Sequence, residues 1–174
     1  MLILTAVPEE QADRNESFGG IRVYCSGPIR GDTSFVDNYH HLIEMVNELG
    51  AMALAESGND IRRERNKNDD GKYPPGDRGI YKRDMEWLES SHCVVAEVSA
   101  PSHGAGFEIS YALFVMNIPV LIFHSRKGKR LSAMLQGCDL PNITVIHYSD
   151  FGEIEVRLRE FLHRVSKKKR TESL

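Results

Sequence analysis

The sequence of 174 residues contains few cysteines and no long hydrophobic run. Its three cysteines, Cys25, Cys93 and Cys138, are odd in number and widely spaced, which fits neither a disulfide framework nor a zinc site. The histidines show no metal-binding spacing such as HExxH. No stretch approaches the ~20 apolar residues of a membrane-spanning helix, and the segment MLILTAVPEE lacks the basic region of a signal peptide. These absences favour a cytoplasmic protein in a reducing compartment, without metal or membrane contact.

The sequence also has no strong excess of one charge. Its 22 lysines and arginines nearly balance 25 aspartates and glutamates, which gives a formal net charge of −3 and a sequence pI of about 6.2. Composition therefore gives no reason to expect binding to nucleic acid or to a membrane surface, although a local pocket can still bind one phosphate group. The chain length and the 41% of hydrophobic residues are those of a single domain with one core.

Short β-rich segments alternate with segments of helical periodicity along the chain. The expected strands are 21–26, 51–55, 93–98, 120–123 and 143–147, and the expected helices are 35–49, about 80–90, 107–116 and 154–165. Alternating helices and continuously apolar strands predict an α/β fold, with a doubly wound, five-stranded parallel sheet of the flavodoxin-like or Rossmann-like kind and helices on both faces. In such sheets ligands bind at the carboxyl ends of the strands.

Three segments fall outside this pattern. Residues 1–19 are expected to be a loose arm, and 57–79 is polar and rich in turn-forming residues, which favours an insertion or a lid. The segment 167–174 is expected to be a basic tail, because four consecutive residues from Lys167 onward are basic. Such a cluster is either a solvated tail or a nuclear-localisation signal, so a nuclear location stays open beside the cytoplasmic one. Residues 20–166 then form one domain.

The first expected strand runs into a glycine-rich turn with the sequence SGPIRGD at 26–32. A turn of this kind brings backbone N–H groups to the edge of the sheet, where an anion or a sugar can bind. Arg30 can pair with a phosphate, because a guanidinium offers a planar fork of donors. It is equally well explained as a surface residue of a tight turn. The turn is neither a Walker P-loop nor a GxGxxG dinucleotide fingerprint.

Glu108 follows the third expected strand after a run of small residues. The run SAPSHGAG at 99–106 lets a substrate approach the backbone closely, and Glu108 is expected in the first turn of the next helix. There the helix dipole favours the ionised carboxylate, which suits a nucleophile that attacks the anomeric carbon of a sugar. The alternative is that Glu108 only complements the helix dipole, as acids in first turns often do.

Three further side chains are candidates that the residues alone do not decide. Asp84 lies on the expected helix at 80–90, where an acid is common. Glu97 is a carboxylate within a buried strand, so it lies either beside a ligand or in a hydrogen bond with a loop, since burial without a partner is costly. Tyr24 faces one side of the first strand, where a tyrosine usually belongs to the core.

Five motifs occur in an order and spacing that resemble one family. They are YCSGPIRG at 24–31, DMEWL at 84–88, VVAEV at 94–98, GAGFE at 104–108 and GKRLSAM at 128–134. Over residues 21–165 they resemble the nucleoside 2-deoxyribosyltransferase superfamily, and within it the members that hydrolyse deoxynucleoside 5′-monophosphates. Each motif is weak alone, whereas the five in order are specific.

The resemblance implies an N-glycosidase and assigns roles to the candidates. Glu108 matches the carboxylate that attacks the anomeric carbon and forms a covalent glycosyl-enzyme. Asp84 matches the acid that helps the base to leave and helps to activate water, and Tyr24 matches a tyrosine that orients the nucleophile. The implied products are the free base and 2-deoxyribose 5-phosphate, and no cofactor is implied. The two carboxylates would act as in retaining glycosidases, applied to a C–N bond.

The same resemblance implies the substrate-binding positions. Around the sugar and phosphate it places Ser26, Gly27, Ile29, Arg30, Gly31, Ser102, Gly104, Gly106, Ser132 and Met134. Ser132 matches a serine that reaches the phosphate across a dimer interface, which implies a homodimer. Two departures from the family pattern, Pro28 for a serine and Ser57 for a histidine, concern base preference and, to a lesser degree, phosphate recognition.

Three other functions stay open at this point. A nucleoside 2-deoxyribosyltransferase would exchange bases on unphosphorylated deoxynucleosides, which would leave Ser102, Ser132 and Arg30 with little to do. A phosphoribohydrolase acting on ribonucleotides usually carries a Pro-Gly-Gly-x-Gly-Thr run, which this sequence lacks. A non-catalytic nucleotide-binding sensor on the same fold would not need both Asp84 and Glu108.

Overall fold

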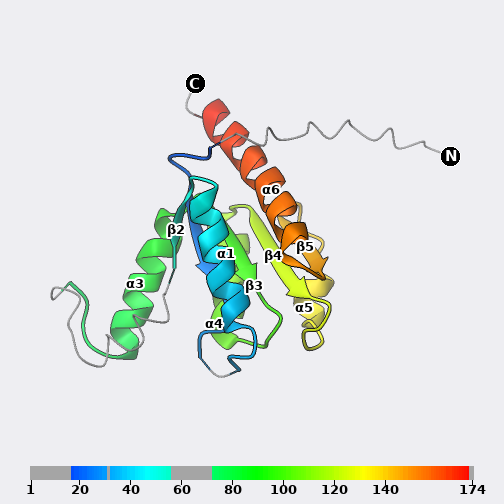
Figure 1. The fold of residues 1–174 in the computed structure, drawn as a ribbon. Helices are drawn as coiled ribbons and strands as arrows, with labels where there is room; N and C mark the ends of the chain where they lie inside the picture. Colours follow the sequence, from blue (N-terminus) through cyan, green and yellow to red (C-terminus); the bar gives the residue numbers. More distant parts are fainter. Residues whose placement is uncertain (1–16, 31, 56–71, 173–174) are drawn as a thin grey trace.

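The computed structural model describes residues 17–30, 32–55 and 72–172. In this part of the chain five strands form one sheet in the order β2-β1-β3-β4-β5, and every neighbouring pair is parallel. This order is that of flavodoxin-like, doubly wound sheets, so the predicted fold class is confirmed (Figure 1). The strands are β1 (Arg22–Ser26), β2 (Met52–Leu54), β3 (Cys93–Glu97), β4 (Val120–Ser125) and β5 (Ile143–Tyr148). The helices are α1 (Val36–Glu48), α3 (Asp77–Ser90), α4 (His103–Tyr111), the π-helix η1 (Ala112–Met116), α5 (Ala133–Gln136) and α6 (Phe151–Glu172).

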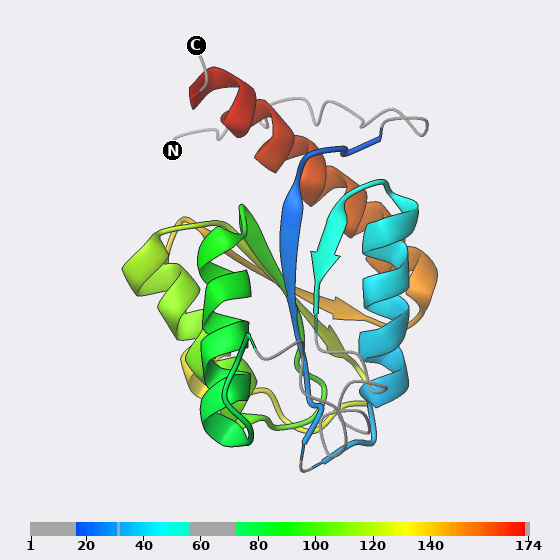
Figure 2. The ribbon, with the colours of Figure 1, turned by 90° about the vertical axis from the view of Figure 1, so that its left-hand side faces the viewer.

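Two helical layers cover the two faces of the sheet (Figure 2). On one face α1 and α6 bury residues such as Tyr39, Leu42 and Leu158, each of them fully shielded from solvent. On the other face α3, α4 and η1 bury a second apolar cluster that includes Leu88 and Ile109. The predicted helices on both faces are thus present, and the sheet is apolar on both sides, as a parallel sheet requires.

The alternation of side chains along β1 decides which residues reach which layer. Val23 and Cys25 belong to the cluster under α1 and α6, whereas Tyr24 belongs to the cluster under α3 and α4. Successive side chains of a strand point to opposite faces, so Ser26 shares the face of Tyr24. The hydroxyl groups of both residues therefore lie on the side of the sheet where α3 and α4 pack.

A glycine ends α1 and lets the chain return into β2. Gly50 has φ +81°, a left-handed conformation that a side chain disfavours, and its N–H donates to the carbonyl of Asn47. A Cβ at this position would lie 2.2 Å from the Ser17 hydroxyl oxygen. The predicted stop of the first helix at Gly50 therefore has both a conformational and a steric cause.

The observed helix boundaries correct two predicted ones. α4 begins at His103 and not at Phe107, because the Ser102 hydroxyl caps the helix by accepting from the Ala105 N–H at 3.2 Å. Glu108 therefore lies in the second turn of α4 and not in its first. α3 begins at Asp77, a few residues before the predicted start near 80, and the short helix α5 was not predicted at all.

Both ends of the described chain are more ordered than expected. Phe18 is 1% exposed and its N–H donates to the Leu49 carbonyl, so the expected loose arm is wrong at its last residues, while 1–16 lie outside the described residues. The basic cluster that begins at Lys167 lies within α6, where the structure shows a helix in place of the expected tail. Of the expected insertion, 57–71 lies outside the described residues and 77–79 form the start of α3. Among the described helices, none is both long and apolar enough to cross a membrane.

Candidate active site

A cavity of about 350 Å³ opens at the carboxyl ends of β1 and β3, where ligands of doubly wound sheets bind. It brings together Tyr24, Asp84 and Glu108, the three residues that the sequence predicted as catalytic. These side chains come from β1, α3 and α4, elements that are far apart in the sequence. The other residues lining the cavity are Cys25, Ser26, Gly27, Ile29, Arg30, Tyr39, Ile80, Ser102, His103, Gly104 and Ala105.

Two hydroxyl groups of β1 hold the Glu108 carboxylate. The buried Ser26 donates its hydroxyl hydrogen to Glu108 Oε2 at 2.6 Å. Tyr24, which is 4% exposed, also forms a hydrogen bond with Glu108. Because the two donors are two residues apart on one strand, they reach the same face and meet the carboxylate from the same side. Charge-assisted hydrogen bonds of this kind are among the stronger ones in proteins.

The surroundings of Tyr24 keep its hydroxyl protonated. Burial raises the pKa of Tyr24 far above its ordinary value of 10.0, and the negative charges of Glu108 and Asp84 raise it further. The phenol is therefore a permanent donor to Glu108. Because the charges of Glu108 and Asp84 both act on the Tyr24 hydroxyl, the two carboxyl groups lie around the same part of the cavity.

Two glycines create space in this cavity. A Cβ on Gly27 would lie 2.3 Å from Cδ2 of the Tyr39 ring, so only glycine lets the turn after β1 pack over that ring. Tyr39 itself is fully buried and donates to the Cys25 carbonyl at 3.1 Å. Gly104 lies one turn before Glu108, and a Cβ there would be 3.9 Å from Glu108 Oε1. A side chain at 104 would thus occupy the space beside the carboxylate.

An arginine that the sequence analysis did not single out contacts Asp84. Arg83 donates to Asp84 Oδ1 from Nε at 3.0 Å and from Nη2 at 2.9 Å. Its guanidinium is 4.7 Å from the centre of the Trp87 ring, in a cation–π contact, and only 5% of Arg83 is exposed. Adjacent helical residues do not normally face each other, so spacing gave no hint of this pair. The sequence signal for the position of Arg83 was its spacing from Trp87, because residues four apart lie on the same face of a helix.

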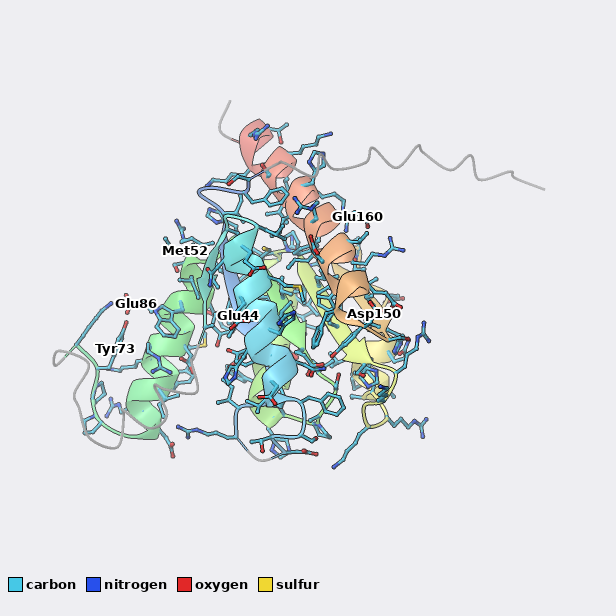
Figure 3. All side chains as sticks on the ribbon, viewed as in Figure 1. Glu44, Met52, Tyr73, Glu86, Asp150 and Glu160 are labelled. Carbon is cyan, nitrogen blue, oxygen red and sulfur yellow. The ribbon has the colours of Figure 1, made fainter. Side chains whose placement is uncertain are left out.

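The segment that precedes α3 contacts the exposed face of this helix. Lys72 Nζ and the Tyr73 hydroxyl each contact the Glu86 carboxylate at 2.6 Å (Figure 3). These contacts are exposed and contribute little to stability individually. They do fix how the chain enters α3, the helix that carries Asp84.

The predicted turn after β1 lies at the rim of the cavity. Arg30 lines the cavity and forms an exposed ion pair with Asp77 in the first turn of α3, with 3.0 Å between Nη1 and Oδ1. Its side chain is 54% exposed. Ile29 also lines the cavity, whereas Gly31 lies outside the described residues.

A second cavity, of about 460 Å³, lies on the other side of the first turn of α4. Gly106, Ser132 and Met134 line this cavity and do not line the one that contains Glu108. Ser132 accepts a hydrogen bond from the Met134 N–H at 3.3 Å and caps α5. The two cavities share Ser102, His103 and Ala105. The structure therefore divides the predicted substrate-binding residues between two neighbouring cavities.

Glu97 resolves an alternative that the sequence left open. It is fully buried and accepts hydrogen bonds from the hydroxyl and N–H of Ser99 and, at 2.9 Å, from the Tyr148 hydroxyl. It does not line the cavity of Glu108. Burial raises the pKa of Glu97, while its hydrogen bonds oppose that rise. The hydrogen bonds of the buried Glu97 carboxyl group are thus made within the protein, by Ser99 and Tyr148. They hold the segment after β3 in place.

The part of the chain that the structure describes contains no group of three or more histidine, cysteine, aspartate or glutamate side chains that could hold a metal ion. The polar side chains that line the Glu108 cavity are carboxylates, hydroxyl groups, Arg30 and His103.

Comparisons with known proteins point to one family. A family model described as nucleoside 2-deoxyribosyltransferase matches residues 23–154. The chain is 34% identical over 142 residues to a 5-hydroxymethyl-dUMP N-hydrolase of Tetraodon nigroviridis, covering 81% of this chain and 96% of that protein. It is 32% identical over 158 residues to the 5-hydroxymethyl-dUMP N-hydrolase of Homo sapiens, covering 87% of this chain and 84% of that protein.

A solved structure supports the same fold. The CMP N-glycosidase of Clostridium botulinum superposes with a TM-score of 0.52 at 17% identity, covering 79% of this chain and 97% of that chain. At this identity the likeness concerns the fold. With a family match over most of its length and relatives of this similarity, the chain belongs to the nucleoside 2-deoxyribosyltransferase family.

Proposed function

We propose that the protein hydrolyses the N-glycosidic bond of 2′-deoxynucleoside 5′-monophosphates, releasing the free base and 2-deoxyribose 5-phosphate. One observation carries the proposal: the Glu108 carboxylate accepts hydrogen bonds from Ser26 and Tyr24 inside a cavity that Asp84 also lines. Two relatives are named as hydrolases of 5-hydroxymethyl-dUMP, which is itself a deoxynucleoside monophosphate.

In the first half of the reaction Glu108 is the nucleophile. One of its carboxylate oxygens forms a bond to C1′ as the C–N bond breaks, and Asp84, which is protonated in the substrate complex, donates its proton to the departing base. The electron pair of the C–N bond leaves with the base, through a sugar of oxocarbenium character. Ser26 and Tyr24 orient the carboxylate, so the attacking oxygen is positioned before the substrate binds.

In the second half water releases the sugar. Asp84, now ionised, accepts a proton from a water molecule whose oxygen bonds to C1′ as the ester to Glu108 breaks. Two displacements at one carbon give net retention of configuration, as in retaining glycosidases. Arg83 keeps the Asp84 carboxylate in one orientation through both steps.

The hydroxyl groups around Glu108 also supply a reason for deoxyribose selectivity. Tyr24 and Ser26 occupy the side of the carboxylate next to β1. A 2′-hydroxyl on the sugar would compete for these hydrogen bonds or crowd the two side chains. A deoxyribose leaves both donors on Glu108.

For the phosphate we assign residues from two copies of the chain. Ser102 and Arg30 line the Glu108 cavity, whereas Ser132 and Met134 of the same chain line the second cavity. The resemblance to the family implies that Ser132 serves the cavity of a neighbouring copy in a homodimer. The exposed apolar side chain of Met134 lines the second cavity, where a second copy would cover it. Phe107 on α4 and Phe114 on η1 are exposed as well.

The decisive experiment incubates the protein with a panel of nucleotides and measures the released base. Deoxynucleoside monophosphates, including 5-hydroxymethyl-dUMP, should be cleaved, and the matching ribonucleotides and unphosphorylated deoxynucleosides should not. Glu108→Gln should fold normally and lose turnover by about three orders of magnitude or more. Adding a free acceptor base separates hydrolysis from transfer, because a transferase would yield a new nucleoside. Near-normal turnover by Glu108→Gln would refute the assignment of the nucleophile.

A further inference from the structure

Two histidines face each other on β4 and β5, at the β5 edge of the sheet. The proposed reaction uses neither of them. His124 on β4 and His147 on β5 are partners in the register of the parallel pair. Their Nδ1 atoms are 3.2 Å apart, and the rings meet edge to face with their centres 5.1 Å apart. His124 is 6% exposed. His147 is only partly buried, so the two rings form a direct contact between the interior and the surface that calls for a physical role.

Each ring also contacts one end of the segment that carries Ser132. The His124 Nε2 atom lies 2.7 Å from the carbonyl oxygen of Lys129. The His147 Nε2 atom lies 2.9 Å from the side-chain Oε1 of Gln136, at the end of α5. A single chain of contacts thus runs from Lys129 through both rings to Gln136. We call residues 129–136 the Ser132 segment.

The atoms at the two ends of this chain of contacts show how the rings are linked. The Lys129 carbonyl oxygen accepts a hydrogen bond, so His124 Nε2 carries a hydrogen. The two Nδ1 atoms share one hydrogen bond, and the Gln136 side-chain amide contacts His147 Nε2. Every ring nitrogen of the pair therefore has a hydrogen-bond partner.

From this geometry we infer that His124 and His147 are positioning residues, which are linked to each other and hold the Ser132 segment in the place where Ser132 meets a substrate phosphate. The inference rests on the proposed function for the role of Ser132. It extends that function by naming what fixes the phosphate-binding segment.

Charged groups of both signs face the pair from several elements. The Glu97 carboxyl group of β3 acts electrostatically on His124 from within the sheet. The Lys129 ammonium group points away to Asp32, at 2.6 Å. On the outer side, His147 lines a cleft between β5 and α6 whose other charged residues are Arg126, Glu153, Arg157 and Glu160. Within it Arg157 and Glu160 are paired at 3.0 Å, so no single sign of charge dominates beside His147.

The first test compares steady-state kinetics of wild type and His147→Phe. The variant should raise KM for a deoxynucleoside monophosphate about tenfold and change kcat less than about threefold. A rise of KM alone separates a role in positioning the phosphate-binding segment from a general loss of structure, which would lower kcat as well.

The control is His41→Gln, which removes an exposed histidine of α1 from outside both cavities. Its KM should match that of the wild type. An unchanged KM for His147→Phe, with or without a loss of kcat, would overturn the inference that the pair positions Ser132 for the phosphate.

The second test needs no activity and separates the two proposals. The N–H groups of Leu135, Gln136 and Gly137 donate to carbonyls of Ser132 and Ala133 within α5. Hydrogen exchange at these amides should lose protection by about tenfold or more in His147→Phe. Unchanged protection would refute the inference that the histidine pair holds the Ser132 segment. Lost protection with an unchanged KM would retain that inference and refute the role of Ser132 in binding phosphate.

Discussion

Ser26 and Glu108, which are 82 positions apart in the sequence, are joined by a hydrogen bond of 2.6 Å across the end of the sheet. The bond links the last residue of β1 to the second turn of α4. It exists because side chains of β1 alternate between the two faces, and because Ser102 starts α4 early enough for Glu108 to point at that face. The orientation of the proposed nucleophile is thus a product of the fold.

Replacing Ser26 by alanine should weaken catalysis without unfolding the protein. The change removes one of the two donors from Glu108 and leaves the other, so kcat should fall about tenfold while KM changes little. Initial rates over a range of substrate concentrations measure both constants. Ser90→Ala is the matched control, because Ser90 is exposed and only donates to the Trp87 carbonyl. A kcat of the wild-type size in Ser26→Ala would show that Tyr24 alone suffices to orient the carboxylate.

Replacing Arg83 by leucine should reduce kcat about tenfold or more, because Asp84 loses the two donors that orient it. Lysine at this position should restore part of the loss, since an ammonium keeps the charge without the fork of donors. The effect should vanish in an Asp84→Asn background, which a double-mutant cycle measures. Arg157→Leu, which breaks an exposed ion pair, is the control. Equal losses from Arg83→Leu with and without Asp84 would mean that the arginine acts elsewhere.

Glu97 should make folding stability depend on pH in a known direction. Burial raises the pKa of Glu97 above its usual 4.5, so the folded protein binds this proton more tightly than the unfolded chain. The stabilisation is complete below about pH 4.5 and is lost as the pH rises through the folded pKa. The free energy of unfolding of the wild type, relative to that of Glu97→Gln, should therefore decrease from pH 4.5 to 8.

Urea unfolding at several pH values measures this difference. Glu48→Gln, at an exposed position of α1, is the matched control for the loss of a surface carboxylate. A rise of the relative stability of the wild type with pH would reverse the sign assigned to Glu97.

A mixture of two inactive or weakened variants should regain activity if Ser132 serves a neighbouring copy. Ser132→Ala should raise KM for the monophosphate about tenfold, and Glu108→Gln should remove turnover. A mixed dimer would contain one cavity with both Glu108 and Ser132 intact. Kinetics after co-refolding the two variants should show a fraction of sites with the wild-type KM. A mixture that only averages its two components would exclude sharing of sites between subunits.

The sequence predicted the five strands and their parallel, doubly wound arrangement because these depend on local patterns. Apolar runs such as 93–98 and the glycine at position 50 are visible without knowing any tertiary contact. The start of α4 was predicted wrongly because the small residues at 103–106 lack an apolar stripe, whereas the cap by Ser102 was a usable signal. Helix α5 is a single turn and is too short for periodicity to indicate it.

The candidate site was likewise predicted only in part. Tyr24, Asp84 and Glu108 were found through a resemblance of motifs, and the structure places all three around one cavity. Arg83 was missed because its contact with Asp84 depends on side-chain conformations that spacing does not encode. The histidine pair was missed for another reason. His124 and His147 become neighbours only through the register of β4 and β5.

The wall that the two cavities share restricts how this part of the molecule can change. Ser102 and Ala105 each line both cavities, so any substitution at either position changes the shape of both. Ile29 borders only the cavity of Glu108 and Leu131 borders only the second cavity, so a substitution at either residue changes one volume. Engineering a new base or sugar preference should therefore start from residues that line only one cavity, and should leave the first turn of α4 unchanged.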